Sequence, residues 1–470
     1  MSAQNAEPSL KPPPKMAGMR TVLQYTGIPP SWLDKRPKLP SRNWLIFLSV
    51  TSTILGYGVY DRRECRRIQQ EYIEKVQELS EGPLQPLEEN RKVTVYGAKW
   101  PGDEDHQQAL KYFRKYVKPI LVAAAVDFDM YSGKYLGDIT KRVAEDIRLR
   151  RRLEAGIDDD SEHKKLLPTY KPLSERKRAE LEGGIVLIGR PTLKEYMAGL
   201  KQGWTNGLEK VEPEDVLARE FDEDHHFDEV DDDLPTQPEK PSYSPIFTMT
   251  SQAMQQKRTT SADTTGSDVP PPSTIPQLPP ILLVPFSNRI GFTQIPLMIW
   301  DWFNKRHLVQ SGSEAAYRLV LANTRPINVP EQPTTEFVDA ETPSEPQGGI
   351  TPPRQEMGDL DFDLSSEAVI KKSLNKLPAE VEESRRKYYE KLPERLATAR
   401  ALSRGTREPT KDEIANPPPT EVELRAERMK KELAWRRDVV GWNTVKPGAP
   451  VTWDERFREA IRIFIDPSEQ

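Results

Sequence analysis

The chain is poor in the residue types that most often perform catalysis or bind metals. Its 470 residues include a single cysteine, Cys65, and five histidines. One cysteine excludes an intramolecular disulfide and a zinc site built from cysteines. The sequence also lacks the HExxH motif of zinc proteases, a Walker-type nucleotide loop and the GxSxG motif of serine hydrolases. It therefore predicts no catalytic, metal or cofactor site, and we interpret Cys65 as an incidental thiol.

Apolar residues are also scarce. They make up 36% of the chain, against 30% charged residues and 44 prolines. The length alone would allow about three domains, but much of a chain with this composition cannot bury a core. The exception is residues 44–60, which carry no charge and lie between Arg42 and Asp61.

Residues 44–60 are predicted to form a membrane-spanning helix. A helix of this length extends about 25 Å, at the short end of what crosses a hydrocarbon core of ~30 Å. A buried core helix is the alternative, but the polar side chains here are small hydroxyls that can bond back to their own helix, with two tyrosines, Tyr57 and Tyr60. Trp44 and Tyr60 lie at the two ends, where amphipathic aromatics favour a membrane interface. One face is small or polar, and we expect its Ser52 and Gly56 to contact a neighbouring membrane helix.

Charge is distributed unevenly about this helix. Residues 1–43 carry seven basic and two acidic residues, so their net charge is +5 and that of the remaining chain is −10. Basic residues beside a span favour the cytoplasm-like face, so we expect the N-terminus there and the bulk of the chain on the other side. Neither a cleavable signal peptide nor an amphipathic presequence is recognisable, and the span itself is expected to serve as the targeting signal.

Composition divides the chain into segments with different expected structures. They are a basic N-terminal segment (1–43), the transmembrane helix (44–60), a juxtamembrane helix and linker (61–90), an α/β lobe (91–210), a disordered acidic and Ser/Thr/Pro-rich insertion (211–280), a second lobe segment (281–324), a Pro-rich linker (325–364) and a charged helical C-terminal region (365–470).

The α/β lobe is predicted from alternating strands and helices. We expect strands at 93–97, 126–131 and 185–189, separated by helices at 105–125 and 135–153. This alternation predicts a parallel sheet. The wholly apolar strand at 185–189 predicts a sheet that is covered on both faces.

The segment after this apolar strand carries a reduced phosphate loop. Residues 185–200 (IVLIGRPTLKEYMAGL) resemble the nucleotide-binding lobe of the diacylglycerol, sphingosine and acylglycerol lipid kinases. In that family the strand runs into Gly-Gly-Asp-Gly-Thr, and a helix N-terminus faces the anion. Here only Gly189, Arg190 and Pro191 precede Thr192, so the aspartate is missing and proline removes an amide donor. The resemblance implies a retained fold and a lost phosphate cradle.

Three weaker candidates each have a structural alternative. His225 and His226 could bind a metal, but an acidic loop without fixed geometry is the favoured interpretation. Residues 148–152 (RLRRR) could contact phosphate headgroups, but a solvated helix end explains them better. The aromatic cluster at 300–303 could seat on a partner or a membrane surface, and plain core packing explains it equally well.

Two N-terminal motifs carry a more specific resemblance. Residues 25–33 (YTGIPPSWL) and 36–44 (RPKLPSRNW) run directly into the apolar helix. They resemble the fungal large subunit of the mitochondrial inner-membrane carrier translocase, the subunit that faces the intermembrane space. The resemblance implies a non-catalytic scaffold with its N-terminus in the matrix, in a complex that inserts multi-pass carrier proteins into the inner membrane in a potential-dependent way.

The same resemblance implies a set of partners. These are the channel-forming subunit and other translocase subunits, small intermembrane-space chaperones, carrier precursor proteins and inner-membrane lipid, with no nucleic acid. Ser52 and Gly56 would then contact the channel-forming subunit. The alternative functions are a membrane-anchored mitochondrial lipid kinase, which Arg190 and Pro191 disfavour, and a lipid-binding module, which the sequence leaves open.

Overall fold

The computed structural model describes residues 41–80, 82, 90–158, 172–210, 212–227, 270–329 and 358–466. Contacts divide the chain into two units, Met1–Tyr60 and Asp61–Gln470. Most of the predicted basic N-terminal segment, with all of its first motif and residues 36–40 of its second, and most of the two Pro-rich stretches lie outside the described residues. What the sequence predicts for them stays a prediction.

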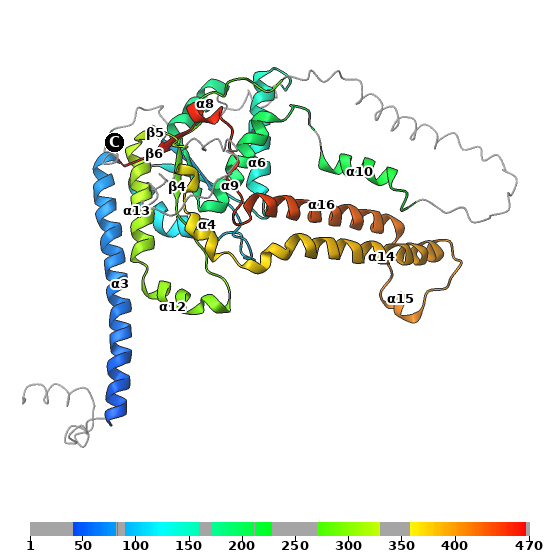
Figure 1. The fold of residues 1–470 in the computed structure, drawn as a ribbon, viewed down its shortest axis with the longest axis horizontal. Coiled ribbons are helices and arrows are strands. Elements are labelled where there is room, and N and C mark those ends of the chain that lie inside the picture. The colour runs from blue at the N-terminus through cyan, green and yellow to red at the C-terminus, as the bar shows by residue number, and fades with distance from the viewer. Residues whose placement is uncertain are drawn as a thin grey trace, which may run out of the picture. The chain divides into compact units, whose positions relative to one another are not determined.

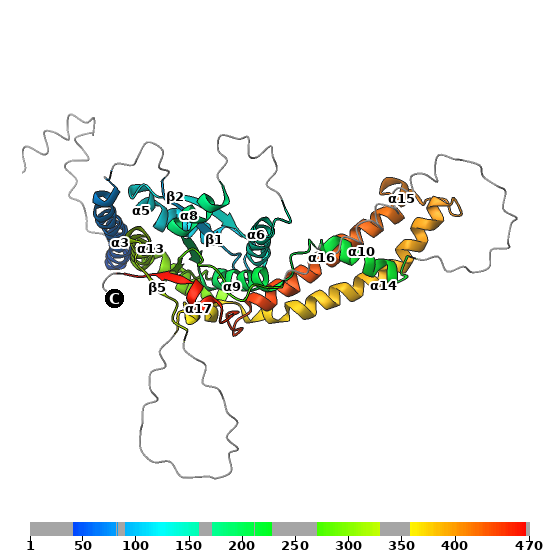
Figure 2. The same cartoon turned by 90° about the horizontal axis from the view of Figure 1, so that it is seen from above.

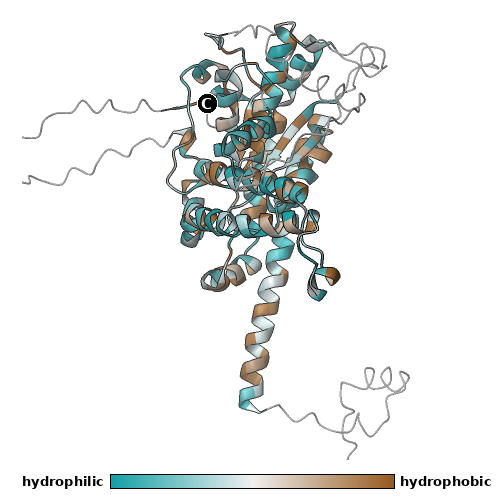
Figure 3. Cartoon of the chain, turned by 90° about the vertical axis from the view of Figure 1, so that its right-hand side faces the viewer, coloured by the Kyte–Doolittle hydropathy of each residue, from teal (hydrophilic) through white to brown (hydrophobic). Residues whose placement is uncertain are grey.

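Helix α3 (Arg42–Ser80) contains the whole apolar run, so the predicted helical conformation of residues 44–60 is confirmed. Most of its large apolar side chains are exposed, and Figure 3 shows hydrophobic and neutral residues along this part of the helix. Three hydroxyls donate to carbonyls one turn earlier, as Thr51 does to Phe47 at 2.8 Å. Among the described residues, no helix has both the length and the apolar character needed to cross a membrane. The predicted span is therefore not confirmed.

Six strands of the Asp61–Gln470 unit form one sheet in the order β2-β1-β3-β4-β6-β5. All neighbours pair in parallel except β5 and β6, so the predicted parallel sheet is confirmed. The three predicted strands are present within a residue or two. The strands are β1 (Lys92–Gly97), β2 (Asp127–Ser132), β3 (Ile185–Ile188), β4 (Ile281–Val284), β5 (Thr324–Pro326) and β6 (Arg462–Phe464).

Helices cover both faces of this sheet. Every residue of β3 is buried: Val186 and Ile188 face one core, and Ile185 and Leu187 face the other. The first core is closed by the later part of α3, the continuous helical segment α4–η1–α5 and α13. The second is closed by α6 and α9. These helices are α4 (Gln108–Tyr112), η1 (Phe113–Val117, a π-helix), α5 (Lys118–Ala123), α6 (Asp138–Glu154), α9 (Arg190–Thr205) and α13 (Arg306–Leu321), with α8 (Leu173–Gly183) preceding β3.

Two helices of the C-terminal region extend from this core as a hairpin (Figures 1 and 2). They are α14 (Leu377–Ser403) and α16 (Glu421–Val445), joined through α15 (Lys411–Ala415). Thr420 and Glu423 form a capping box at the start of α16. Near its other end, a Cβ added to Gly441 would lie 2.1 Å from the carbonyl oxygen of Leu136, so glycine is required where α16 meets the loop before α6.

Four sequence predictions about the later part of the chain are wrong. The acidic stretch after 211 forms α10 (Pro213–Glu223), because Leu217 is buried and Arg436 of α16 binds Glu220. Residues 281–324 do not form a separate lobe, since β4 pairs with β3 in the same sheet. The C-terminal region is not wholly helical, because β6 enters the sheet between β4 and β5.

The fourth correction concerns residues 368–377, which the prediction of a helical C-terminal region (365–470) places in a helix. Residues 364–369 and 372–376 form 3₁₀ turns instead. The remaining short elements are η2 (Phe292–Gln294), α12 (Ile295–Phe303), η3 (Asp359–Asp361), η4 (Leu364–Val369), η5 (Lys372–Lys376) and α17 (Phe457–Ala460).

Candidate functional site at the start of helix α9

The turn from β3 into α9 lies at the carboxyl end of a central strand, where α/β sheets usually bind ligands. Gly189 makes the turn with φ at +78°, a conformation that glycine adopts without strain. A Cβ at this position would lie 3.1 Å from the carbonyl oxygen of Phe286. Pro191 follows in the first turn of α9, where the missing amide hydrogen costs no helical bond.

Arg190 is buried at this turn, with only 3% of its surface exposed. Its guanidinium donates to the Glu367 carboxylate from Nε, and to the carbonyl oxygens of Leu360 and Phe362 at 3.0 and 2.9 Å from Nη1. The Arg190 side chain of the reduced phosphate loop therefore binds groups of the chain itself. It is bound by the segment around η3 and η4.

Glu367 balances two buried cations. Besides Arg190, it binds Lys194 Nζ at 2.6 Å and accepts from the Gly448 backbone amide at 2.8 Å. Burial acts to raise the pKa of Glu367, but these hydrogen bonds outweigh it and hold the pKa below its ordinary value. Lys194 also donates to the carbonyl oxygen of Lys446 at 2.9 Å. The cluster is thus an ionised carboxylate whose oxygens accept from Arg190, Lys194 and one backbone amide.

Thr192 completes the closure of the loop. Its hydroxyl donates to the Ile188 carbonyl at 2.5 Å and accepts from the Ala98 amide at 2.9 Å, which links α9 to the end of β1. All of Arg190, Pro191 and Thr192 are buried. The chain thus holds the carboxylate of Glu367 near the N-terminus of α9, where negative charge is favoured. Sequence reasoning missed Glu367 because it lies 177 residues from Arg190.

Glu195, one turn further along α9, serves the neighbouring helix. Its carboxylate accepts from the amides of Gly137 at 2.8 Å and Ile139 at 3.2 Å, at the start of α6. The side chain is fully buried, and burial raises its pKa from 4.5 to about 8 in spite of these two bonds. Glu195 therefore holds the start of α6 against α9.

This raised pKa gives a testable pH dependence. Between about pH 4.5 and pH 8 the folded chain holds a proton on Glu195 that the unfolded chain has released. The free energy of unfolding should therefore fall as the pH rises through this window, by at most about 1.4 kcal/mol per pH unit. Urea unfolding of the detergent-solubilised chain at pH 5 and pH 8 measures this slope. Glu195→Gln should reduce it, and an unchanged slope in the variant would assign the dependence to other groups.

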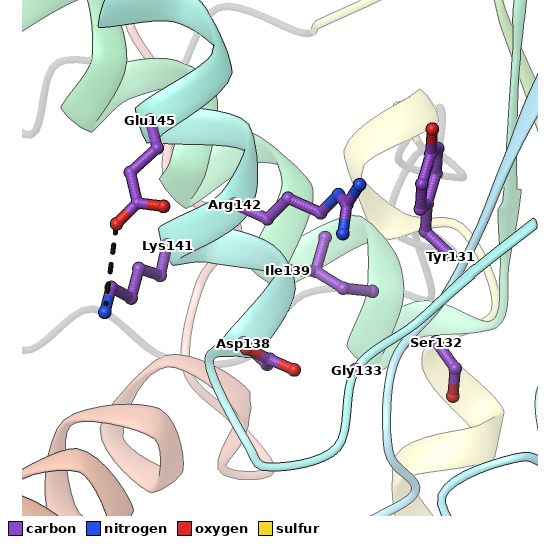
Figure 4. Close-up of a pocket in the computed structure, with 8 residues that line it drawn as sticks. All are labelled: Tyr131, Ser132, Gly133, Asp138, Ile139, Lys141, Arg142 and Glu145. Carbon is purple, nitrogen blue, oxygen red and sulfur yellow. Dashed lines mark ion pairs between the residues drawn. The ribbon is translucent and has the colours of Figure 1, made fainter.

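One open pocket lies beside this site, at the end of β2 (Figure 4). Arg142 points toward the ring of Tyr131, with its guanidinium carbon 3.8 Å from the ring centroid. Lys141 pairs with Glu145, and the Ser132 hydroxyl donates to the carbonyl oxygen of His106 at 2.9 Å. The pocket's polar groups are thus engaged locally, and their arrangement indicates no particular chemistry.

The structure places Arg150, Arg151 and Arg152 in intramolecular contacts. Arg151 is buried and donates to the carbonyl oxygens of Gly203 and Asn206, while Arg150 binds Glu180. Arg152 binds Asp158 at 3.0 Å. Both earlier interpretations, headgroup binding and a solvated helix end, miss the buried role of Arg151.

The histidine pair follows α10 and lies beside α14 of the helical hairpin. The ring of His226 packs against Tyr389, with centroids 5.3 Å apart. Within the described ranges, no three His, Cys, Asp or Glu side chains are grouped so that they could hold a metal ion. Ser52 and Gly56 lie on exposed positions of α3, and a Cβ on Gly56 would meet nothing within 4 Å.

Sequence comparison identifies the family. The model of the family described as "Inner membrane protein import complex subunit Tim54" matches residues 21–385. The chain belongs to the Tim54 family. The matched residues include the apolar helix, the reduced phosphate loop and Glu367.

Curated relatives support this assignment. The mitochondrial import inner membrane translocase subunit TIM54 of Cryptococcus neoformans is 35% identical over 97% of this chain and 96% of its own length. The Aspergillus oryzae subunit is 33% identical over 62% of this chain and 67% of its own. The Candida albicans subunit is 29% identical over 67% and 86%, respectively. The predicted membership of a fungal inner-membrane translocase family is confirmed, and the lipid kinase resemblance has no comparable support.

Proposed function

We propose that this chain is a non-catalytic scaffold subunit of the translocase that inserts multi-pass carrier proteins into the mitochondrial inner membrane under the membrane potential. Membership of the Tim54 family supports the proposal that the chain is a subunit of an inner-membrane import complex. The observation that supports a non-catalytic role is the closed start of α9, where Glu367 binds both Arg190 and Lys194. In this role the chain supports the channel-forming subunit, docks the small intermembrane-space chaperones and receives carrier precursors.

Import into isolated mitochondria tests this role. Mitochondria depleted of the chain should insert less of a radiolabelled multi-pass carrier precursor at full membrane potential, whereas a matrix-targeted precursor with a cleavable presequence should import normally. Restoring a chain with Arg190→Met, Lys194→Met and Glu367→Met should restore carrier insertion, because no ligand is bound through these charges. Equal loss of both import routes would contradict a carrier-specific role.

We also propose that residues 44–60 anchor the chain in the inner membrane. The apolar side chains exposed on this part of α3 and the hydroxyls bonded back to their own helix support this. The run is short, and a short span is accommodated by local thinning of the bilayer at a modest cost. The family's inner-membrane location agrees with it.

The charge difference about this helix predicts its orientation, with the N-terminus in the matrix. Protease added to mitochondria with a ruptured outer membrane should degrade the chain after Tyr60. An epitope placed before Pro30 should stay protected, as should a soluble matrix protein as the control. Protection of the large C-terminal part would reverse the orientation.

A membrane-anchored lipid kinase is the alternative function, and a lipid-binding module without catalysis is the second. The kinase requires that the α9 turn accept a nucleotide phosphate, which the Glu367 carboxylate opposes by charge. The purified chain should therefore not transfer phosphate from ATP to diacylglycerol in mixed micelles. Stoichiometric phosphorylation of the lipid would overturn the scaffold proposal.

A further inference from the structure

Helix α12 is an apolar helix that the fold leaves uncovered. None of its residues is buried, and the four largest exposures among its apolar side chains belong to Trp300 (65%), Trp302 (56%), Ile299 (54%) and Leu297 (48%). Phe292, just before it, is 92% exposed. Exposed patches of this kind on a folded protein mark a surface that contacts a membrane or a partner. This excludes the core-packing interpretation of the aromatic cluster at 300–303.

The polar groups near α12 are arranged so that its surface stays apolar. Its single charged residue, Asp301, is neutralised by Arg289 at 2.7 Å. Cations lie at the C-terminal edge of the helix, where Arg62 and Lys305 each lie 5.9 Å from the ring of Trp302. An apolar surface with tryptophan beside a cationic edge is typical of helices that lie at the phospholipid headgroup level.

The end of α12 is tied to the start of the Asp61–Gln470 unit. Asp61 is the first residue after the apolar run, and it is only 1% exposed. Its carboxylate accepts from the Lys305 amide at 3.0 Å and binds the Arg306 guanidinium at 3.1 Å. Because Lys305 and Arg306 follow α12 almost directly, the helix lies close to the point at which the chain leaves residues 44–60.

We propose that α12 lies in the plane of the inner-membrane surface, with its apolar side chains in the headgroup and upper acyl region of the phospholipids. The proposal rests on the anchoring role proposed for residues 44–60, because an anchored Tyr60 brings Asp61, and with it α12, to the membrane surface. At nine residues the helix is about 13 Å long, too short to cross a bilayer and long enough to lie along its surface.

This placement gives the chain two lipid contacts. Residues 44–60 would hold it in the membrane, and α12 would limit its rotation and tilt about that anchor. The neutralised Asp301 and the buried Asp61 leave no uncompensated carboxylate at the contact, which suits a membrane with anionic lipids. The helical hairpin would then be held at a defined orientation above the membrane.

Fluorescence quenching by lipid tests the proposal on the full chain. Cys65→Ser removes the only cysteine, and single cysteines are then introduced by Trp300→Cys, Leu55→Cys or Val422→Cys and labelled with the environment-sensitive dye NBD. Val422 lies on α16 and is 76% exposed, so it is a matched control for an exposed apolar side chain away from α12. The chain is reconstituted alone in vesicles of phosphatidylcholine, phosphatidylethanolamine and cardiolipin, with or without nitroxide-labelled lipids.

We expect lipid nitroxides near the headgroup to quench the label at position 300 more strongly than nitroxides near the end of the lipid acyl chain do. Both kinds of nitroxide should leave the label at position 422 unquenched. Deep nitroxides should quench the label at position 55. An unquenched label at 300 with a quenched label at 55 would overturn the placement of α12 while the anchor stands, and would assign the patch to a partner protein. An unquenched label at 55 would overturn the anchor, and quenching at 300 would then support α12 as a lipid contact on its own.

Discussion

Replacing Glu367 with alanine should lower the free energy of unfolding by about 3–5 kcal/mol, because removal of one partner from a buried ion cluster leaves the other charges uncompensated. The Glu367 side chain is 10% exposed, and its two cationic partners, Arg190 and Lys194, are 4% and 2% exposed. Neither cation can turn to water without opening the start of α9. Urea unfolding of the detergent-solubilised chain, followed by tryptophan fluorescence, measures the loss.

A surface pair provides the control for this experiment. Arg178 and Glu182 form an ion pair with 82% and 61% of their side chains exposed, so Glu182→Ala should change stability by less than about 1 kcal/mol. Combining Arg190→Met and Lys194→Met with Glu367→Met should recover much of the loss, since apolar side chains can replace a buried ionic cluster. If Glu367→Ala behaves like Glu182→Ala, the cluster does not hold the C-terminal segment on α9.

Replacing both Ser52 and Gly56 with leucine should abolish co-purification of the channel-forming subunit. Helices in lipid associate through small residues that let their backbones approach, and through interhelical hydrogen bonds worth ~0.6–2 kcal/mol each. Leucine at both positions would separate the backbones while it keeps the run apolar. Because a Cβ on Gly56 meets nothing within 4 Å, the change should leave the fold of the chain itself intact.

Affinity purification from digitonin-solubilised mitochondria measures this effect. The matched control is Leu48→Ile with Leu55→Ile, which alters two bulky exposed positions of the same helix without making its small face larger. Normal recovery of the channel-forming subunit with the double leucine variant would make residues 44–60 a passive tether. Recruitment would then lie in the Asp61–Gln470 unit.

The reduced phosphate loop binds a carboxylate, Glu367, from a distant part of the same chain. An α/β sheet with a turn at the carboxyl end of β3 retains the architecture that places a ligand at a helix N-terminus. Here the chain supplies the anion from η4, and the same cluster joins α9 to the segment before α14 and, through Gly448, to the segment after α16. In this chain the start of α9 thus holds the segments at both ends of the helical hairpin.

The sequence by itself determined the features that depend on local patterns. Alternating apolar residues and strand–helix spacing predicted β1, β2, β3 and the parallel sheet, because a buried strand and an amphipathic helix each leave a periodic signal over a short window. The apolar run at 44–60 was predicted to be helical because an uncharged apolar stretch of this length is typical of a membrane-spanning helix. The N-terminal motifs also identified the family, although most of the residues that carry them lie outside the part of the chain that the structure describes.

Only the tertiary structure decided the features that join distant segments. β6 is three residues long, too short to show a periodic pattern. It is a strand because it pairs with β4 on one side and β5 on the other. The partners of Arg190 and of Asp61 lie 177 and 245 residues away, and no local window contains both members of such a pair. The sequence also could not decide whether α12 is exposed, because an apolar helix has the same residue pattern whether the fold buries it or leaves it exposed.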